Sequence, residues 1–285
     1  MRHVYECPMR WADMDMLGHV NNVTYVDYLQ EARIDMLAAH APARGSEELA
    51  DGVVVVRHEV QFRSPLPWRP EPVKVECWVS ELRAATFTMA YEIYDEGDDG
   101  ERRVYVRATT LLTPYVFAEE RPRRISPVER EALQAVLEPG FDKSPRVPAV
   151  PDPGPRHTLP TWVRWSDVDA YGHVNNVKYF EYFQEARIQY LRSLPREEDG
   201  PWANWVVAHT DVDYRRPILF RLEPYEVTQW VAEVGGKSAV LVGEIRDGDQ
   251  VLARSRAVLV AFDQETQRAT EMNPRQRERL IGEIA

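Results

Sequence analysis

The stretch RWADMDMLGHVNNVTYVDYLQEAR, residues 10–33, occurs a second time as RWSDVDAYGHVNNVKYFEYFQEAR, residues 164–187. The two copies share 16 of 24 residues. The similarity continues downstream, where VQFRSPL at 60–66 corresponds to VDYRRPI at 212–218. The chain is therefore an internal duplication. We expect one domain at 1–138 and a second at 158–285. A proline-rich linker at 139–157 joins them, because its composition favours extended over packed backbone.

Composition narrows the class of protein. The 285 residues carry a formal charge of -11, which argues against nucleic acid as the main partner, because phosphate binding needs a basic surface. Two cysteines, Cys7 and Cys77, are too few for a disulfide framework. No apolar run is long enough for a membrane helix, and the N-terminal residues lack the apolar segment of a signal peptide. We expect a cytoplasmic protein with no membrane partner.

Each copy predicts the same order of elements. A short strand, His3–Trp11 or Thr158–Trp165, precedes a polar loop, and a helix follows at Val23–Ala38 or Val177–Leu194. The helices carry apolar stripes at helical spacing: Tyr25, Leu29, Ala32 and Met36 in the first, and Tyr179, Phe183, Ala186 and Tyr190 in the second. Four strand-like runs then follow in each copy.

Local signals add detail to these strands and their ends. TFTMAYEIY at 86–94 alternates apolar with smaller or polar residues, which predicts a half-buried strand. Asp247-Gly248 predicts a hairpin. Ser126 with Glu129 predicts a capped helix start, and Asn273-Pro274 predicts a similar one. The fold class is α+β: each half wraps a curved antiparallel sheet around one long helix, and the two halves pair edge to edge as a pseudo-dimer.

The loop before each helix gathers residues that suit acyl-transfer chemistry. In the first copy it reads Asp13-x-Asp15-x-x-Gly18-His19-Val20-Asn21-Asn22, and in the second Asp167-x-Asp169-x-x-Gly172-His173-Val174-Asn175-Asn176. Asn22 and Asn176 are the predicted N-caps. The free amides at the helix start favour negative charge. A carboxylate beside such donors could attack a carbonyl or activate water while the amides stabilise the oxyanion.

Structural roles compete with catalytic ones in this loop. Asp13 and Asp167 fit a turn cap or a pair with the preceding arginine better than they fit catalysis. His19 and His173 fit either a hydrogen-bonded loop residue or a functional group. Tyr25 and Tyr179 are either core residues or substrate contacts. Gly18 and Gly172 predict a backbone with positive φ.

The motif does not predict a metal site. Its beginning matches a calcium loop, but position five is Leu17 or Tyr171 and position twelve is Thr24 or Lys178, none of which supplies the required ligand. A zinc site is not expected either, because the motif has no second histidine or cysteine nearby to act as a ligand. We expect no metal and no cofactor.

The motif, with Tyr25 and the Glu-Ala-Arg that ends the repeat, resembles that of hotdog-fold acyl-CoA thioesterases of the 4-hydroxybenzoyl-CoA thioesterase-like family. The second copy is also similar to the acyl-ACP thioesterases of plants, which are double hotdogs. The resemblance implies that Asp15 and Asp169 act as nucleophile or general base. It also implies that the amides of Asn22 and Asn176 polarise the carbonyl. The plant pattern has an asparagine where this chain has Leu17 and Tyr171, which favours acyl-CoA.

A CoA ester also requires cations and contacts around the reacting group. The candidates for binding the nucleotide part of CoA are Arg63, Arg215 and Arg216. The competing interpretation is that they are solvated charges at a strand end. Gly18, Gly172, Asn21, Asn175, Tyr25 and Tyr179 are the other predicted substrate-binding residues. We expect an acyl-CoA thioesterase of fatty acid metabolism, active in both halves, with coenzyme A only as part of the substrate. Alternatives are an acyl-ACP thioesterase, a hotdog dehydratase or hydratase, and a non-enzymatic acyl-thioester binding module. Assembly into a homo-oligomer of double hotdogs is left open.

Overall fold

The computed structural model describes residues 2–40, 52–97, 100–141, 156–194 and 204–284. They belong to two units, Met1–Ser144 (unit 1) and Pro145–Ala285 (unit 2). Most of the linker predicted at 139–157 lies outside the described residues, because 142–155 are not among them.

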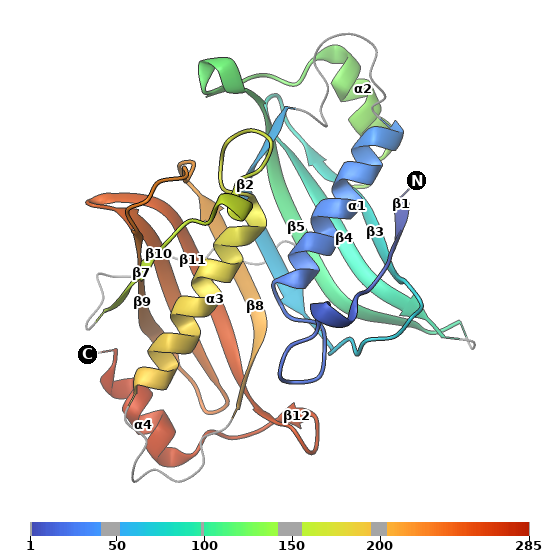
Figure 1. Cartoon of the computed structure of the whole chain (residues 1–285). Coiled ribbons are helices and arrows are strands. Elements are labelled where there is room, and N and C mark those ends of the chain that lie inside the picture. The colour runs from blue at the N-terminus through green and yellow to red at the C-terminus, as the bar shows by residue number, and fades with distance from the viewer. Residues whose placement is uncertain (1, 41–51, 98–99, 142–155, 195–203, 285) are drawn as a thin grey trace. The chain divides into compact units, whose positions relative to one another are not determined.

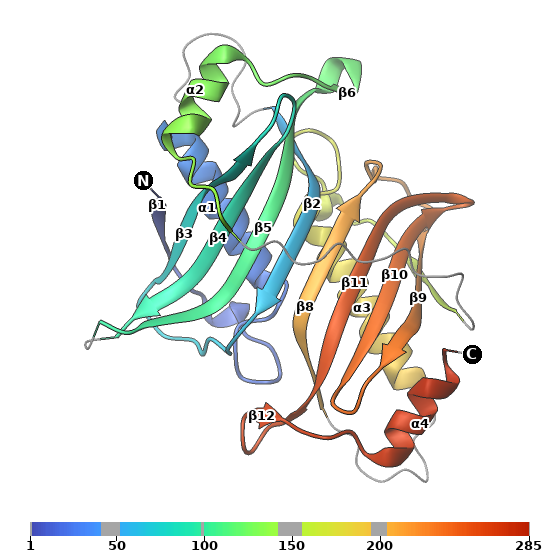
Figure 2. The ribbon, with the colours of Figure 1, turned by 180° about the vertical axis from the view of Figure 1, so that it is seen from behind.

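Unit 1 places one long helix across a face of an antiparallel sheet with strand order β1-β3-β4-β5-β2 (Figures 1 and 2). The helix is α1 (Thr24–His40). The strands are β1 (His3–Cys7), β2 (Val53–Phe62), β3 (Val73–Leu82), β4 (Phe87–Glu96) and β5 (Arg102–Val116). Short elements complete the unit: η1 (Trp11–Asp13), η2 (Phe117–Glu119), β6 (Arg121–Pro122) and α2 (Pro127–Ala135).

Unit 2 repeats this arrangement with strand order β8-β11-β10-β9-β7 against α3 (Asn176–Ser193). Its strands are β7 (His157–Thr161), β8 (Asn204–Tyr214), β9 (Tyr225–Val234), β10 (Ser238–Asp247) and β11 (Gln250–Asp263). The short elements are η3 (Trp165–Asp167), β12 (Arg268–Ala269) and α4 (Pro274–Gly282). No helix in the described segments is long and apolar enough to cross a membrane.

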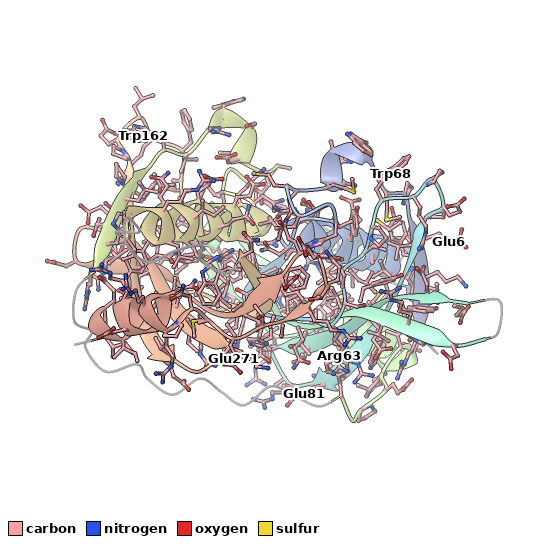
Figure 3. The ribbon with its side chains drawn as sticks, turned by 90° about the horizontal axis from the view of Figure 1, so that it is seen from below. Glu6, Arg63, Trp68, Glu81, Trp162 and Glu271 are labelled. Carbon is pink, nitrogen blue, oxygen red and sulfur yellow. The ribbon has the colours of Figure 1, made fainter. Side chains whose placement is uncertain are left out.

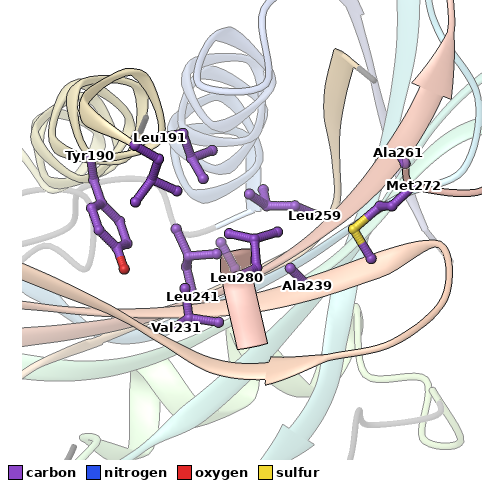
Figure 4. Packing of buried hydrophobic residues seen from close by; sticks show 11 residues of the cluster. Tyr190, Leu191, Val231, Ala239, Leu241, Leu259, Ala261, Met272 and Leu280 are labelled. Atoms are coloured by element: carbon purple, nitrogen blue, oxygen red, sulfur yellow. The ribbon is translucent and has the colours of Figure 1, made fainter. Parts of the chain in front are cut away.

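The apolar stripes are buried as predicted. Every stripe residue in α1 and α3 is at most 3% exposed. In unit 2 the far end of the stripe packs with side chains of β9, β10, β11 and α4 (Figure 4). This cluster includes Tyr190, Leu191, Leu241, Leu259 and Leu280. Burial of each such side chain stabilises the fold by roughly 1.5–3 kcal/mol. The apolar stripe therefore holds the helix on the sheet.

The first strand of each unit is shorter than predicted. β1 ends at Cys7 and β7 at Thr161, whereas the sequence pattern extended them to Trp11 and Trp165. In unit 1 the next residue is Pro8, which cannot donate to the strand ladder. In both units the backbone then enters a 3-10 turn, η1 or η3, instead of continuing the strand.

Strand β4 is buried on both faces, so the prediction of a half-buried strand was wrong. Every residue from Phe87 to Tyr94 is buried. The face away from α1 includes Glu92, whose carboxylate pairs with Arg102 at 2.8 Å and Arg107 at 2.7 Å. The long arginine side chains cover this face, and no apolar pattern in β4 itself could indicate that.

The predicted hairpin turn and the predicted caps of α2 and α4 are confirmed. β10 and β11 form a hairpin in which Asp247 pairs with Gln250, and Gly248 has φ of +56°. Ser126 caps α2 through the predicted capping box with Glu129. Asn273 caps α4 by accepting a hydrogen bond from a backbone amide of its first turn.

Candidate active site in each repeat

The loop before each long helix turns back on itself. In unit 1 the amide of Asp15 donates to the carbonyl of His19 at 3.0 Å, and the amide of Gly18 donates to the carbonyl of Asp15 at 3.1 Å. Unit 2 repeats both bonds, at 2.8 and 3.1 Å. Gly18 and Gly172 have φ of +83° and +81°, as predicted. Side chains rarely adopt that conformation, so glycine permits the reversal.

The first aspartate of each motif is structural. Asp13 is 3% exposed, and its carboxylate accepts hydrogen bonds at 2.7 Å from both the amide of Arg10 and the hydroxyl of Tyr28. In unit 2 the carboxylate of Asp167 accepts from Tyr182 at 2.7 Å. Burial and the neighbouring carboxylate raise the pKa of both tyrosines. These hydrogen bonds therefore hold the helix against the loop, and we assign the first aspartate a structural role.

The second aspartate is half-buried and only partly engaged. Asp15 Oδ1 accepts from the amide of Leu17 at 2.8 Å, and Asp15 Oδ2 lies 3.5 Å from the side-chain nitrogen of Asn21. Asp169 Oδ1 accepts from the amide of Tyr171 at 2.9 Å. Neither carboxylate forms an ion pair within the described ranges. One oxygen of each is thus oriented by the backbone, while the other has at most the long contact with Asn21.

The helix cap lies one residue earlier than predicted. Asn21 Oδ1, and not the side chain of Asn22, accepts from the amide two residues further on at 2.9 Å. Asn175 rather than Asn176 does the same in α3, also at 2.9 Å. An asparagine side chain reaches the amide two residues ahead most easily. The correction releases Asn22 and Asn176 from the capping role and places their amides at the beginning of the helix.

The amide of Asn22 faces no acceptor among the residues that the structure describes. Its neighbour Asn21 is the residue whose side chain lies beside the Asp15 carboxylate. The start of α1 therefore offers an N–H without an acceptor in the described residues, next in sequence to Asn21, whose side chain contacts the weakly engaged Asp15 oxygen. This is the arrangement that stabilises a developing oxyanion next to a base or nucleophile.

The remaining predicted residues of the loop have mostly structural contacts. His19 is half-buried, and its Nδ1 lies 3.4 Å from the carbonyl of Val20. The hydroxyls of Tyr25 and Tyr179 accept from the amides of Leu66 and Ile218 at 3.2 and 3.0 Å. Both tyrosines are 3% exposed. They connect the helix to the loop after β2 or β8, and burial raises the pKa of both phenols. His173 forms an isolated β-bridge with Leu219.

The predicted CoA-binding arginines lie at strand ends and are exposed. The amide of Arg63 donates to Tyr105, and those of Arg215 and Arg216 both donate to Leu252. Figure 3 shows Arg63 on the side of the sheet away from α1. The contacts of the described residues do not bring these side chains to the loop, and a role in CoA binding stays a prediction.

Two features of the site were not predicted. An exposed aromatic pair accompanies each loop: Trp11 with Trp68, and Trp165 with Phe220, with ring centroids 5.5 and 5.4 Å apart; Trp68 is labelled in Figure 3. The arginine that ends each repeat, Arg33 or Arg187, is buried. The repetition of Trp and Arg in both copies was the available signal. No cluster of three or more metal-ligating side chains occurs among the described residues.

Comparison with known proteins places this site in a family context. A model of the thioesterase-like superfamily matches residues 9–137 and 163–280. The chain is 30% identical over 125 residues to the long-chain acyl-CoA thioesterase FadM of Escherichia coli, covering 41% of this chain and 92% of that protein. It is 32% identical over 124 residues to the uncharacterised protein YsmA of Bacillus subtilis, covering 42% of this chain and 81% of that protein.

Solved structures show the same architecture over nearly the whole chain. The 12:0-ACP thioesterase from Umbellularia californica superposes with a TM-score of 0.70 at 17% identity, covering 92% of this chain and 94% of that chain. An acyl-ACP thioesterase from Bacteroides thetaiotaomicron gives 0.67 at 16% identity, covering 90% and 97%. At such identities the likeness shows the fold alone.

Proposed function

The chain belongs to the thioesterase-like superfamily, and from that premise we propose that it hydrolyses acyl-CoA thioesters at one site in each repeat. Membership confirms the expected hotdog fold and the expected thioester hydrolase. The choice of CoA as carrier, and of the residues that act, belongs to the proposal. The similarity to FadM, a long-chain acyl-CoA thioesterase, supports the CoA ester.

One observation carries the proposal: the partly engaged Asp15 carboxylate contacts the side chain of Asn21, and the next amide, that of Asn22, has no acceptor in the described residues. Asp15 attacks the thioester carbonyl or removes a proton from water, and the amide of Asn22 donates to the carbonyl oxygen as negative charge develops there. In the general-base route the oxygen of water bonds to the acyl carbon, the C–S bond breaks, the proton taken by the carboxylate passes to the thiolate, and the other proton leaves with the acid. In the nucleophilic route the carboxylate forms a mixed anhydride as the thiolate leaves; water then hydrolyses the anhydride, one of its protons going to the thiolate and the other leaving with the acid, and the carboxylate is regenerated. Asp169 and Asn176 are assigned the same roles in unit 2 because the motif is repeated there.

The test is thiol release, read with a thiol-reactive dye, over short, long, branched and aromatic acyl-CoAs. We expect turnover in the native protein and a loss of about 10²–10⁴-fold in kcat in the Asp15→Asn/Asp169→Asn variant. Burial raises the pKa of both Cys7 and Cys77 to about 12, so the protein's own thiols contribute little signal. Unchanged turnover in the double variant would refute the assigned role of the aspartates.

The carrier is decided by offering each acyl group on CoA and on ACP. We expect preference for CoA, since Leu17 and Tyr171 replace the asparagine of the plant acyl-ACP pattern. Higher kcat/KM on ACP esters would overturn that choice while leaving the hydrolase intact. Ligand-induced thermal stabilisation without turnover on either carrier would favour the binding module instead.

The pairing of the two repeats as a pseudo-dimer is part of the same proposal. Duplicated domains commonly retain the two-fold association of an ancestral dimer, and pairing would protect the edge strands. In this arrangement each repeat completes the acyl pocket of the other. A cytoplasmic location without cofactor or metal accompanies the proposal.

A further inference from the structure

The last residue of strand β8 contacts the beginning of helix α3. The hydroxyl of Tyr214 donates a hydrogen bond of 2.9 Å to the backbone carbonyl of Asn176, the first residue of α3. Asn176 is also the residue whose amide is assigned to the carbonyl oxygen of the substrate. A side chain from the sheet therefore holds the residue that carries the proposed oxyanion donor, although the proposed hydrolysis does not itself use this side chain.

The Tyr214 hydroxyl fixes a peptide unit that is already held at its other end. The unit between Asn176 and Val177 donates its N–H to Asn175 Oδ1 at 2.9 Å and accepts from Tyr214 at its C=O. The preceding unit carries the amide of Asn176, and its C=O accepts from the amide of Lys178 at 3.0 Å. Only the two torsions at Asn176 relate these planes, so fixing the second plane also limits the direction of the Asn176 amide.

Unit 1 lacks this hydrogen bond, because Phe62 takes the place of Tyr214 in the duplicated stretch. Both residues end the strand that follows the long helix, β2 or β8. A phenyl ring has no donor, and the carbonyl of Asn22 has none among the residues that the structure describes. The cap itself is the same, since Asn21 Oδ1 accepts from the amide of Val23 at 2.9 Å. The hydroxyl is therefore the difference between the two helix starts at this contact.

The two helices also begin at different places in the repeat. α3 begins at Asn176, directly after its cap, whereas α1 begins at Thr24, two residues later in the aligned sequence. Asn22 and Val23 form a turn, and the amide of Val26 donates to the carbonyl of Val23 at 2.8 Å, as in a 3-10 turn. The hydroxyl thus coincides with α-helical backbone at the residue that carries the proposed oxyanion donor.

The ring that carries the hydroxyl is packed against the helix. Tyr214 meets Tyr179 edge to face, with ring centroids 4.9 Å apart. Tyr179 is 3% exposed, and its hydroxyl accepts from the amide of Ile218 in the loop after β8. Phe62 also packs against Tyr25 in unit 1, with centroids 5.7 Å apart. Both repeats therefore place an aromatic ring here, and only unit 2 adds a donor to it.

We propose that Tyr214 is a positioning residue, whose hydroxyl holds the start of α3 so that the amide of Asn176 is directed at the carbonyl oxygen of the thioester. It acts through the backbone and not on the reacting atoms. Donors that are already oriented lower the barrier because they need no reorganisation as charge develops, so the effect falls on kcat. This inference rests on the proposed function, since it concerns the same site.

The experiment uses proteins with one site each. Asp15→Asn leaves the site of unit 2, and Asp169→Asn leaves that of unit 1. In the Asp15→Asn background, Tyr214→Phe should lower kcat for thiol release by about threefold to tenfold, the weight of one neutral hydrogen bond. KM should stay unchanged, because the lost interaction belongs to the transition state. In the Asp169→Asn background, Phe62→Tyr should raise kcat by a similar factor.

A matched control and a second readout separate positioning from stability. Tyr190→Phe removes a hydroxyl bond of the same 2.9 Å, to Glu283, near the other end of α3, so it should lower Tm without lowering kcat. Amide hydrogen exchange reports on the helix start without any substrate. Tyr214→Phe should accelerate exchange at Val177 and Lys178 by about threefold to tenfold, because this turn then opens more readily.

Several outcomes would overturn the inference while leaving the hydrolase in place. These are an unchanged kcat in Tyr214→Phe, a change confined to KM, an equal loss of kcat in Tyr190→Phe, and an unchanged kcat in Phe62→Tyr. Equal losses in the two tyrosine variants would make the hydroxyl merely structural. If the native protein turns over no ester, the proposed function fails first. Unchanged exchange at Val177 and Lys178 would then refute the hold on the helix start separately.

Discussion

Two aspartates separated by one residue have different roles because their surroundings differ. Asp13 is buried and accepts two short hydrogen bonds, whereas Asp15 is half-buried and one of its oxygens accepts only a long bond of 3.5 Å from Asn21. The pattern of the motif already favoured a structural first acid and a functional second one. The cap could not be placed as well, because either member of an Asn-Asn pair is a good N-cap by type and only the backbone geometry separates Asn21 from Asn22.

The structural role of Asp13 gives a stability prediction. Tyr28→Phe should lower the free energy of unfolding by about 1–2 kcal/mol, because it leaves the buried carboxylate short of a donor. Tyr182→Phe should behave alike in unit 2. Urea denaturation measures both, with Tyr115→Phe as the control, since that hydroxyl has no hydrogen bond recorded in the described part of the chain. Equal effects in all three variants would contradict a stabilising role for the hydrogen bonds from Tyr28 and Tyr182 to the aspartates.

The helices and turns are the elements that the sequence predicted best. Apolar spacing, the caps at Ser126 and Asn273, and Asp-Gly are local signals, and all three correspond to what the structure contains. The coverage of β4 and the burial of Arg33 depend on residues distant in the sequence. Charge ordinarily indicates a surface, so no pattern within the helix could place that arginine in the interior.

The contact between α3 and β10 gives a prediction for a pair of elements. Gly243→Ala should destabilise the protein by about 1–3 kcal/mol through overpacking against Phe183. Phe183→Leu, the residue found at the equivalent Leu29, should recover part of the loss in the double variant. Thermal unfolding of the four proteins measures the coupling. Gly282→Ala is the matched control, because its Cβ would meet nothing, and additivity of the pair would contradict direct contact.

At the scale of the whole molecule, duplication predicts two working sites. Asp15→Asn alone should leave the contribution of unit 2, and Asp169→Asn alone that of unit 1, with the two residual rates adding to the native rate. The loops share their hydrogen bonds and their glycine conformation, so both should contribute. Initial rates of thiol release at saturating acyl-CoA measure this. Complete loss in either single variant would show that the sites depend on each other.

The proposed pairing of the repeats predicts their behaviour after the covalent link is cut. A specific protease site inserted within 142–155 should allow cleavage into two fragments that still co-elute in size-exclusion chromatography at micromolar concentration. Extensive edge pairing gives interfaces of the obligate kind, which do not separate readily. Fragments that elute separately and remain folded would exclude the pseudo-dimer.

The exchange of bulk between helix and sheet also limits how the two halves of the gene can recombine. Unit 1 holds Leu29 with Tyr91, and unit 2 holds Phe183 with Gly243 at the same two places. Copying the helix of unit 2 into unit 1 without the strand would place two large rings together in unit 1. Copying in the opposite direction would leave a void in unit 2. Overpacking and a void both lower the free energy of unfolding. The helix and the strand of one unit are therefore expected to be exchanged together.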